Sequence, residues 1–385
     1  SLNMVEVYYS FDVQYSTRMP SGEMLIRKAL QKNAIKHNHP TSSNNIGLGM
    51  HRSSKWFVFF VFLTPLWPGI AQEQLTLEAV SAPIPEGLET VEFYSSAVDR
   101  DMKFDVVLPA SYAASGDMNY PVLYLLHGFM QNYTVWGRNL AAAYYSRLMG
   151  DVILVLPDGG NSWYVNYAKS ESGETNNWEN HIVEDVIGYV DSHYRTEARR
   201  EGRAISGLSM GGFGAFALGL RRPHLFVSIG STSGALSYAR TAAQAIRAGV
   251  DRQSNQQDAQ RDGRIAQADA LISQIIDIPG FSTQIERAPT GVDFETAEQA
   301  DAYDPFAIIY KVPKSQMPHI YLDSGTEDGL INEAREIMQI LILNNVSFNY
   351  MQSAGKHNSE YWRRSIGHMI SIQREVMHRA LGNRP

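Results

Sequence analysis

Unbroken runs of apolar residues recur along the chain from residue 121 onward, and polar or turn-forming stretches separate them. Because the runs are continuous rather than alternating, they are typical of strands buried on both faces of a parallel sheet. The runs are PVLYLLHG (121–128), DVILVLPDG (151–159), RAISGLS (203–209), LFVSIGS (225–231) and PHIYLDSG (318–325).

Helical spacing of apolar residues appears between these runs. Positions three and four apart form single stripes over 181–194 and 331–344, and a third stripe follows near the C-terminus. Ahead of them, residues 90–109 contain two β-rich stretches around a charged turn, which predicts a hairpin. The alternation of strands and helices predicts an α/β domain with a doubly wound, mostly parallel sheet.

One segment interrupts this alternation. Residues from about 237 to 299 are rich in Ala, Gln, Arg and Asp, with an amphipathic helical pattern between Ile265 and Ile275. We interpret 237–299 as a helical insertion over the carboxyl edge of the sheet. It is either a cap near a site or a solvated excursion.

The N-terminal region carries a targeting pattern. Basic residues after Met50 precede a short apolar stretch that ends in the small residues of Gly69-Ile70-Ala71. The apolar part is shorter than the roughly 20 residues that span a bilayer, so residues 50–71 read as a secretory signal peptide. The alternatives are a membrane anchor and a buried helix. Residues 1–49 lack a clear period and read as a leader or upstream translation, which leaves 72–385 as the catalytic domain.

Composition narrows the function classes. The 385 residues are 44% hydrophobic with a formal net charge of -7 and no cysteine. The absence of cysteine excludes disulfides, thiolate catalysis and cysteine-ligated metal. A net negative charge does not indicate the basic surface that is typical of nucleic-acid-binding proteins.

A possible nucleophile lies where a predicted strand becomes a helix, in the sequence Gly207-Leu208-Ser209-Met210-Gly211. G-x-S-x-G in this setting predicts a nucleophile elbow, a sharp turn that exposes the serine hydroxyl at the carboxyl edge of the sheet. The Met210 amide would lie at the helix N-terminus, where amides have no intrahelical partner. It is therefore a candidate oxyanion donor.

A serine needs a neighbouring base, and an acid and a histidine should follow it in that order. His357 lies in a loop before the last helix, whereas His368 and His378 lie within the helical pattern. We therefore predict His357 as the base.

Three carboxylates compete for the role of the acid. Asp328 follows the end of the strand pattern at 318–325 and is preferred, while Asp323 and Glu327 remain alternatives.

The loop after the run at 121–128 offers the second oxyanion donor, the amide of Phe129. His127, at the end of that run, is better interpreted as structural support for the loop. Aromatic residues also crowd the candidate loops, and we predict substrate-binding roles for Trp163, Tyr164 and Tyr361.

Five stretches together resemble the esterase-D-type α/β-hydrolases, a family that includes S-formylglutathione hydrolases, tributyrin esterases, feruloyl and acetylxylan esterases and mycolyltransferases. The stretches are YLLHGFMQNYTVW, PDGGNSWYVN, GLSMGGFGA, LDSGTEDGL and GKHNSEYW.

The resemblance implies an α/β-hydrolase fold and a serine esterase that needs no metal or organic cofactor. The residues it implies are Ser209, Asp328 and His357 as the triad, with the Phe129 and Met210 amides as oxyanion donors. The expected substrate is a small-molecule or polysaccharide-linked ester of feruloyl, acetyl or another short acyl group, acted on outside the cytoplasm. No nucleic acid partner is expected, and no stable membrane association after signal cleavage. An S-formylglutathione hydrolase-like thioesterase and a non-catalytic binding protein on a hydrolase fold are the alternatives.

Cleavage of the signal peptide is directly testable. When expression starts at Met50 in a bacterium with a general secretory pathway, we expect protein outside the cytoplasm with its N-terminus near Gln72. N-terminal sequencing checks this. Retention of residues 56–71 would favour a membrane anchor instead.

Overall fold

The computed structural model describes residues 85–171, 173–250 and 289–382, which all belong to one compact unit. The predicted signal peptide, the leader and the centre of the predicted insertion therefore lie outside the described residues. Among the helices described, none has both the length and the apolar character needed to cross a membrane.

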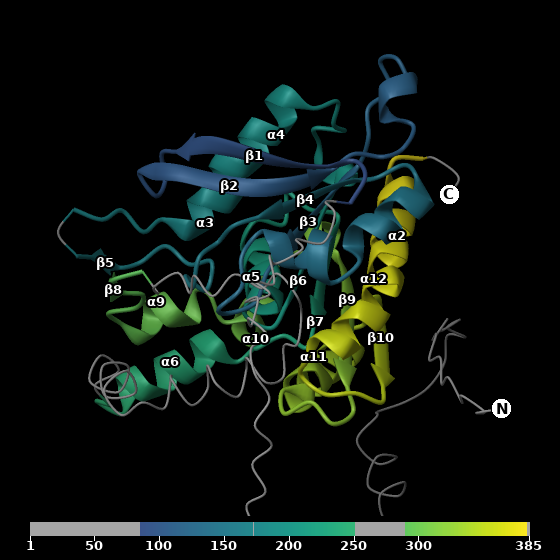
Figure 1. The fold of residues 1–385 in the computed structure, drawn as a ribbon. Helices are drawn as coiled ribbons and strands as arrows, with labels where there is room; N and C mark the ends of the chain where they lie inside the picture. The colour runs from purple at the N-terminus through teal and green to yellow at the C-terminus, as the bar shows by residue number, and fades with distance from the viewer. Residues whose placement is uncertain (1–84, 172, 251–288, 383–385) are drawn as a thin grey trace, which may run out of the picture. The chain divides into compact units, whose positions relative to one another are not determined.

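An eight-stranded sheet runs through the unit in the order β1-β2-β4-β3-β6-β7-β9-β10 (Figure 1). The strands are β1 (Leu88–Ser95), β2 (Arg100–Val107), β3 (Val122–Leu126), β4 (Ile153–Pro157), β6 (Arg203–Leu208), β7 (Ser228–Thr232), β9 (His319–Gly325) and β10 (Phe348–Ser353). The first two form the predicted antiparallel hairpin, and β2 also pairs antiparallel with β4. From β4 to β10 every neighbouring pair is parallel. The predicted doubly wound, mostly parallel sheet is therefore confirmed.

Helices cover both faces of this sheet. The α-helices are α2 (Ala142–Met149), α3 (Trp178–Asn180), α4 (Ile187–His193), α5 (Met210–Arg221), α6 (Tyr238–Arg247), α9 (Ala297–Asp301), α10 (Pro305–Ile308), α11 (Ile331–Leu343) and α12 (Ser359–Ala380). Short 3-10 helices span Tyr112–Ala114, Arg200–Gly202 and Lys314–Gln316, π-helices span Val135–Asn139 and His181–Val186, and β5 (Lys169–Ser170) pairs with β8 (Gly291–Val292) in a second sheet.

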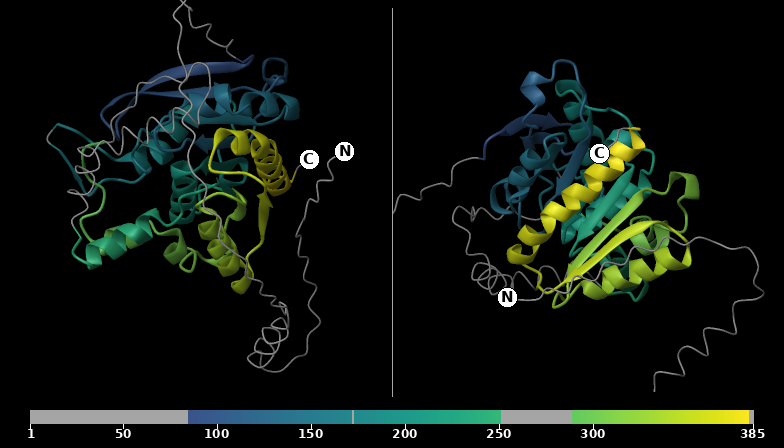
Figure 2. Two further views of the ribbon diagram at one scale, coloured as in Figure 1. Left: turned by 60° about the horizontal axis from the view of Figure 1, so that its bottom comes forward. Right: turned by 90° about the vertical axis from the view of Figure 1, so that its right-hand side faces the viewer.

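The side-chain alternation along each strand assigns the two faces. In β3, Tyr124 packs with α4, α5, α10 and α11, whereas Leu123 and Leu125 pack with α2 and α12. Figure 2 shows α12 lying across the strands, on the opposite side of the sheet from α11. Two apolar layers therefore bury the parallel strands from both sides, which is why their sequences are continuously apolar.

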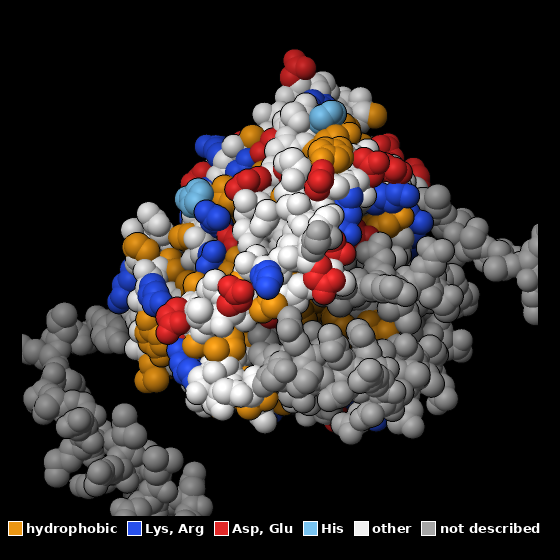
Figure 3. Space-filling model, turned by 90° about the vertical axis from the view of Figure 1, so that its left-hand side faces the viewer, with side chains coloured by type: hydrophobic (Ala, Val, Ile, Leu, Met, Phe, Trp, Pro, Cys, Tyr) orange, Lys and Arg blue, Asp and Glu red, His pale blue; other side chains and the backbone are white. Residues whose placement is uncertain are grey.

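Helix α5 lies at the centre of the packing, with every residue from Met210 to Leu220 buried. One side of it packs on the sheet, and Phe213 and Ala217 join an outer cluster with α6 and α9. The first part of the expected 237–299 insertion, α6, thus contributes to a hydrophobic cluster of the domain. On the side of the molecule shown in Figure 3, basic and acidic side chains are interspersed among the described residues.

Two helical glycines make a matched test of this packing. A Cβ on Gly211 would lie 2.2 Å from the Leu126 carbonyl oxygen, whereas a Cβ on exposed Gly188 would meet nothing within 4 Å. We expect Gly211→Ala to lower the free energy of unfolding by about 1–3 kcal/mol through overpacking. Gly188→Ala should raise it by about 0.5–1 kcal/mol through helix propensity. Urea unfolding checks both, and a Gly211→Ala protein as stable as the parent would contradict the close approach.

Candidate active site

The junction between β6 and α5 places Ser209 at the carboxyl edge of the sheet. Ser209 has a φ of 52° and a ψ of −117°, a sparsely populated conformation that costs on the order of 1–3 kcal/mol for a residue with a side chain. The turn is this sharp because its glycines leave room: a Cβ on Gly207 would lie 2.2 Å from the carbonyl oxygen of Gly211. The Ser209 amide donates to the Thr232 carbonyl of β7 at 3.1 Å. The predicted strand–turn–helix setting of the motif is therefore present.

His357 and Ser209 are brought together although 148 residues separate them in the chain. The imidazole Nε2 lies 3.0 Å from the Ser209 Oγ, and its Nδ1 lies 3.0 Å from Oδ2 of Asp328. The ring of Trp362 packs edge-on against the imidazole at 5.1 Å between centroids. His357 is about one-third exposed, at 34% of its side-chain surface, so it borders both the protein interior and the solvent.

Asp328 lies in the turn between β9 and α11 with its side chain fully buried. Burial acts to raise the pKa of this carboxyl, but the hydrogen bond from His357 and the electrostatic attraction to it, with a smaller contribution from the Leu330 amide, outweigh burial and lower the pKa below its ordinary value. Asp328 is thus held ionised, as a group that orients an imidazole and balances its positive charge must be.

The two competing carboxylates are placed elsewhere. Glu327 is exposed. Asp323 is buried within β9, where its Oδ1 accepts a hydrogen bond from the Thr232 hydroxyl and burial raises its pKa to about 6. Of the three candidates, only Asp328 hydrogen-bonds to His357 among the contacts of the described residues.

The loop after β3 lies against the serine, since a Cβ on Gly128 would be 3.4 Å from the Cβ of Ser209. Amides on both sides of Phe129 are already engaged: Gly128 donates to Gln131 Oε1 and Met130 to Asn161 Oδ1. For the amides of Phe129 and Met210, no acceptor is found among the described residues. These two amides remain the predicted oxyanion donors.

His127 has a structural role, as predicted. It is fully buried; its Nδ1 donates to the Gly128 carbonyl at 2.8 Å and its Nε2 accepts from the Gly159 amide at 2.9 Å. Sequence analysis did not identify Gln131 and Asn161, whose side-chain oxygens hold the same loop. Their polar side chains in loops carry no distinguishing sequence signal.

A cavity of about 200 Å³ opens over the serine. Its lining residues are Gly128, Phe129, Met130, Gln131, Leu208, Ser209, His357, Asn358, Ser359 and Trp362.

The predicted substrate-binding aromatics are only partly placed at this site. Trp163 is half-buried, stacks on Tyr238 at 3.7 Å and lies 6.2 Å from the exposed ring of Phe129. The prediction is wrong for Tyr164, which is fully buried and donates its hydroxyl to the His127 carbonyl. It is also wrong for Tyr361, which is 1% exposed. The next residue, Trp362, lines the cavity instead.

No group of three or more His, Cys, Asp and Glu side chains that could hold a metal ion occurs within residues 85–171, 173–250 and 289–382.

Comparison with known proteins places this geometry in a family. Residues 95–371 match the model of the family described as "Putative esterase". The chain belongs to this esterase family of α/β-hydrolases. The resemblance of the sequence motifs to the esterase-D-type α/β-hydrolases is thereby confirmed.

Two curated relatives are also esterases, with partial sequence identity to this chain. Esterase Rv1288 of Mycobacterium tuberculosis is 36% identical over 155 residues, which cover 38% of this chain and 32% of the relative. An acetyl esterase of Caldicellulosiruptor saccharolyticus is 26% identical over 296 residues, covering 74% of this chain and 97% of the relative. The chain thus spans about a third of the length of the mycobacterial esterase, but nearly all of the acetyl esterase.

Among solved structures, FphF, a fluorophosphonate-binding serine hydrolase of Staphylococcus aureus, has a TM-score of 0.54 at 19% identity. The similarity covers 74% of this chain and 97% of that chain, and it confirms the α/β-hydrolase fold.

The acid can be tested against its neighbour in the sequence. We expect Asp328→Asn to reduce kcat by roughly 10⁴-fold, because a neutral amide neither fixes the imidazole tautomer nor stabilises the imidazolium. Glu327→Gln removes a negative charge one residue away and should leave kcat within a factor of about two, because an exposed side chain without contact to His357 has little influence. Steady-state kinetics on an aryl ester checks both. A crippled Glu327→Gln enzyme beside an active Asp328→Asn enzyme would reassign the acid.

Proposed function

We propose that this chain is a serine carboxylic-ester hydrolase that acts through an acyl-enzyme. The observation that carries the proposal is the unbroken chain of hydrogen bonds from Ser209 Oγ through His357 to the buried Asp328. Nucleophile, base and orienting acid lie within hydrogen-bond reach of one another, as nucleophilic catalysis requires. This constellation also argues against a purely binding role on a hydrolase fold.

In the proposed first step, His357 Nε2 takes the Ser209 proton while Oγ attacks the ester carbonyl carbon. The negative charge on the former carbonyl oxygen is stabilised by the Phe129 and Met210 amides, the second of which is also at the N-terminus of α5. The tetrahedral intermediate collapses as the alcohol leaves with the proton from His357. Water then repeats the sequence: His357 takes its proton, its oxygen attacks the acyl carbon, and Ser209 leaves as the protonated alcohol.

The dimensions of the site favour a short acyl group. The cavity over Ser209, about 200 Å³, is below the roughly 300–1,000 Å³ of sites for drug-sized ligands. An acetyl group requires far less room than a feruloyl group, and the relative covered nearly end to end by this chain is an acetyl esterase. We therefore place acetyl esters first among the substrates.

One observation favours a feruloyl ester as the second candidate. The ring of Phe129 is 45% exposed beside the cavity and lies near Trp163. An aromatic acyl group could stack against this exposed ring, which provides an offset-stacking surface.

We also propose that the enzyme works outside the cytoplasm. The support is the basic start, short apolar core and small-residue end of residues 50–71. An S-formylglutathione hydrolase-like thioesterase would serve a cytosolic substrate, so that alternative fits this targeting pattern less well.

A panel of acyl donors tests the proposed function. We expect the highest kcat/KM for acetyl esters and lower values for butyryl and feruloyl esters, because the cavity is small. We expect little turnover of S-formylglutathione, because the targeting pattern of residues 50–71 favours a substrate outside the cytoplasm. Ser209→Ala is the control and should remove all turnover, since Ser209 supplies the nucleophile. Preferred hydrolysis of S-formylglutathione would support the thioesterase instead. Equal turnover by Ser209→Ala and the parent would reject a serine hydrolase.

A further inference from the structure

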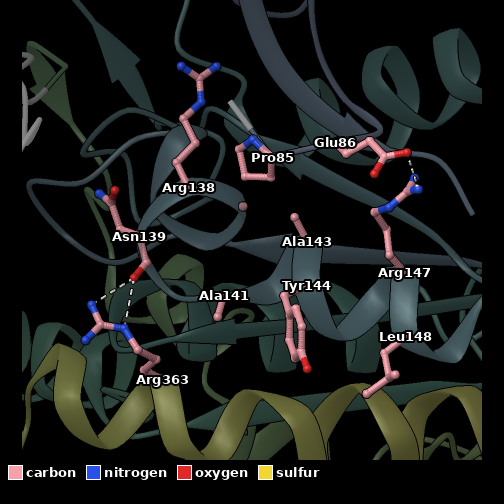
Figure 4. A pocket seen from close by; sticks show the side chains of 11 residues that line it. Pro85, Glu86, Arg138, Asn139, Ala141, Ala143, Tyr144, Arg147, Leu148 and Arg363 are labelled. Carbon is pink, nitrogen blue, oxygen red and sulfur yellow. Dashed lines mark hydrogen bonds and ion pairs between the residues drawn. The ribbon is translucent and has the colours of Figure 1, made fainter. Parts of the chain in front are cut away.

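A second pocket, larger than the one over Ser209, lies between the start of the described chain, the π-helix at 135–139, α2 and α12. Its volume is about 620 Å³. Figure 4 shows the side chains that line it. They are Pro85, Glu86, Gly137, Arg138, Asn139, Ala141, Ala143, Tyr144, Arg147, Leu148 and Arg363.

The lining is basic in a chain whose formal net charge is -7. Arg138 is committed to the buried carboxylate of Asp105, which it contacts at 2.8 Å, and Arg147 contacts Glu86 at 2.8 Å. These pairs neutralise two of the three guanidinium groups.

Arg363 is the third guanidinium, and it is exposed. Its Nε and Nη2 both donate to the carbonyl oxygen of Asn139, at 3.2 and 3.0 Å (Figure 4). Among the described residues, no carboxylate pairs with it and no acceptor is found for its Nη1. The contact with Asn139 fixes one edge of the planar group, while the charge remains available to an anion.

The rest of the pocket supplies an apolar surface. Tyr144 and Leu148, one helical turn apart on α2, are 65% and 68% exposed, which is unusual for side chains of this size. The Tyr144 ring packs edge-on against the ring of Tyr145, with 5.4 Å between centroids, and Ala141 and Ala143 also line the pocket. An amphipathic ring in the same pocket as a positive charge suits a ligand with a flat carbon face and an acidic group.

Both pockets take lining residues from the start of α12. Ser359 and Trp362 line the cavity over Ser209, and Arg363 lines the second pocket. The second pocket is therefore placed to hold a part of the substrate that does not react.

We propose that this pocket binds a carboxylate-bearing sugar unit in the alcohol portion of the ester. The carboxylate pairs with Arg363 and the sugar ring lies against Tyr144. The inference rests on the proposed esterase function, because it assigns the pocket to the same substrate. It makes the enzyme selective for esters carried on acidic saccharides.

Binding without turnover tests the pocket itself. In calorimetry on the full chain carrying Ser209→Ala, an oligosaccharide that ends in glucuronate should bind at least about tenfold tighter than the same oligosaccharide ending in glucose. Added salt should reduce the difference. Free glucuronate binding as tightly as the oligosaccharide would show a site for a free acid, and inorganic phosphate binding equally well would show a general anion site. Either result would overturn the proposal.

Five variants, with a control for each type of residue, test which side chains of the pocket cause the preference. Arg363→Gln should remove the preference for the glucuronate ligand and Arg363→Lys should retain part of it, whereas Arg379→Gln, at an exposed arginine near the far end of α12, should change nothing. Tyr144→Ala should weaken both oligosaccharides, and Tyr310→Ala, at a tyrosine of similar exposure outside the pocket, should weaken neither. An undiminished preference in Arg363→Gln would overturn the proposal.

Hydrolysis of a small neutral acetyl ester by the parent chain separates the two claims. Turnover of that ester without any preference for the glucuronate ligand would leave the esterase standing and remove the second pocket. Absence of turnover on every ester in the panel would remove the esterase function itself.

Discussion

The close approach of β6 and α5 is the constraint on which the site depends. The chain can turn from strand to helix within one residue only because Gly207 and Gly211 have no Cβ, and the one residue between them that carries the strain is Ser209. The same approach directs the start of α5 against the end of β3, where a Cβ on Gly211 would meet the Leu126 carbonyl. Nucleophile, helix N-terminus and the loop that bears Phe129 are therefore set by one packing contact.

The remaining groups converge because β6, β9 and β10 are parallel and their carboxyl ends share one edge of the sheet. Asp328 follows β9 and His357 follows β10, so short loops bring both side chains to the serine. The two side chains hydrogen-bonded behind Ser209 differ in burial: Asp328 is fully buried, whereas His357 is partly exposed. The charge that must persist is thus kept away from water, and the group that exchanges protons has access to substrate and solvent.

The mostly parallel sheet and the position of Ser209 could be predicted from the sequence. Continuous apolar runs mark buried strands, and the glycines around Ser209 mark a sharp turn, so both signals lie within short stretches of the chain. The choice of Asp328 could be preferred but not decided, since Asp323 and Glu327 differ from it mainly in where their side chains point. The sequence wrongly predicts substrate-binding roles for Tyr164 and Tyr361, because aromatic residues in loops look alike in sequence whether they face a pocket or the core. The packing of α6 does not follow from its sequence, because its buried residues are the small alanines Ala239, Ala242 and Ala243, which join a cluster with residues of α5 and α9.

Site-specific labelling with a fluorophosphonate tests the central claim most directly, because the reagent reports an activated serine regardless of the true substrate. Mass mapping of the labelled chain should place the adduct on Ser209. Labelling should be slower by orders of magnitude in His357→Gln, which lacks the base. An adduct on a different serine, or a His357→Gln protein labelled at Ser209 as fast as the parent, would contradict the account.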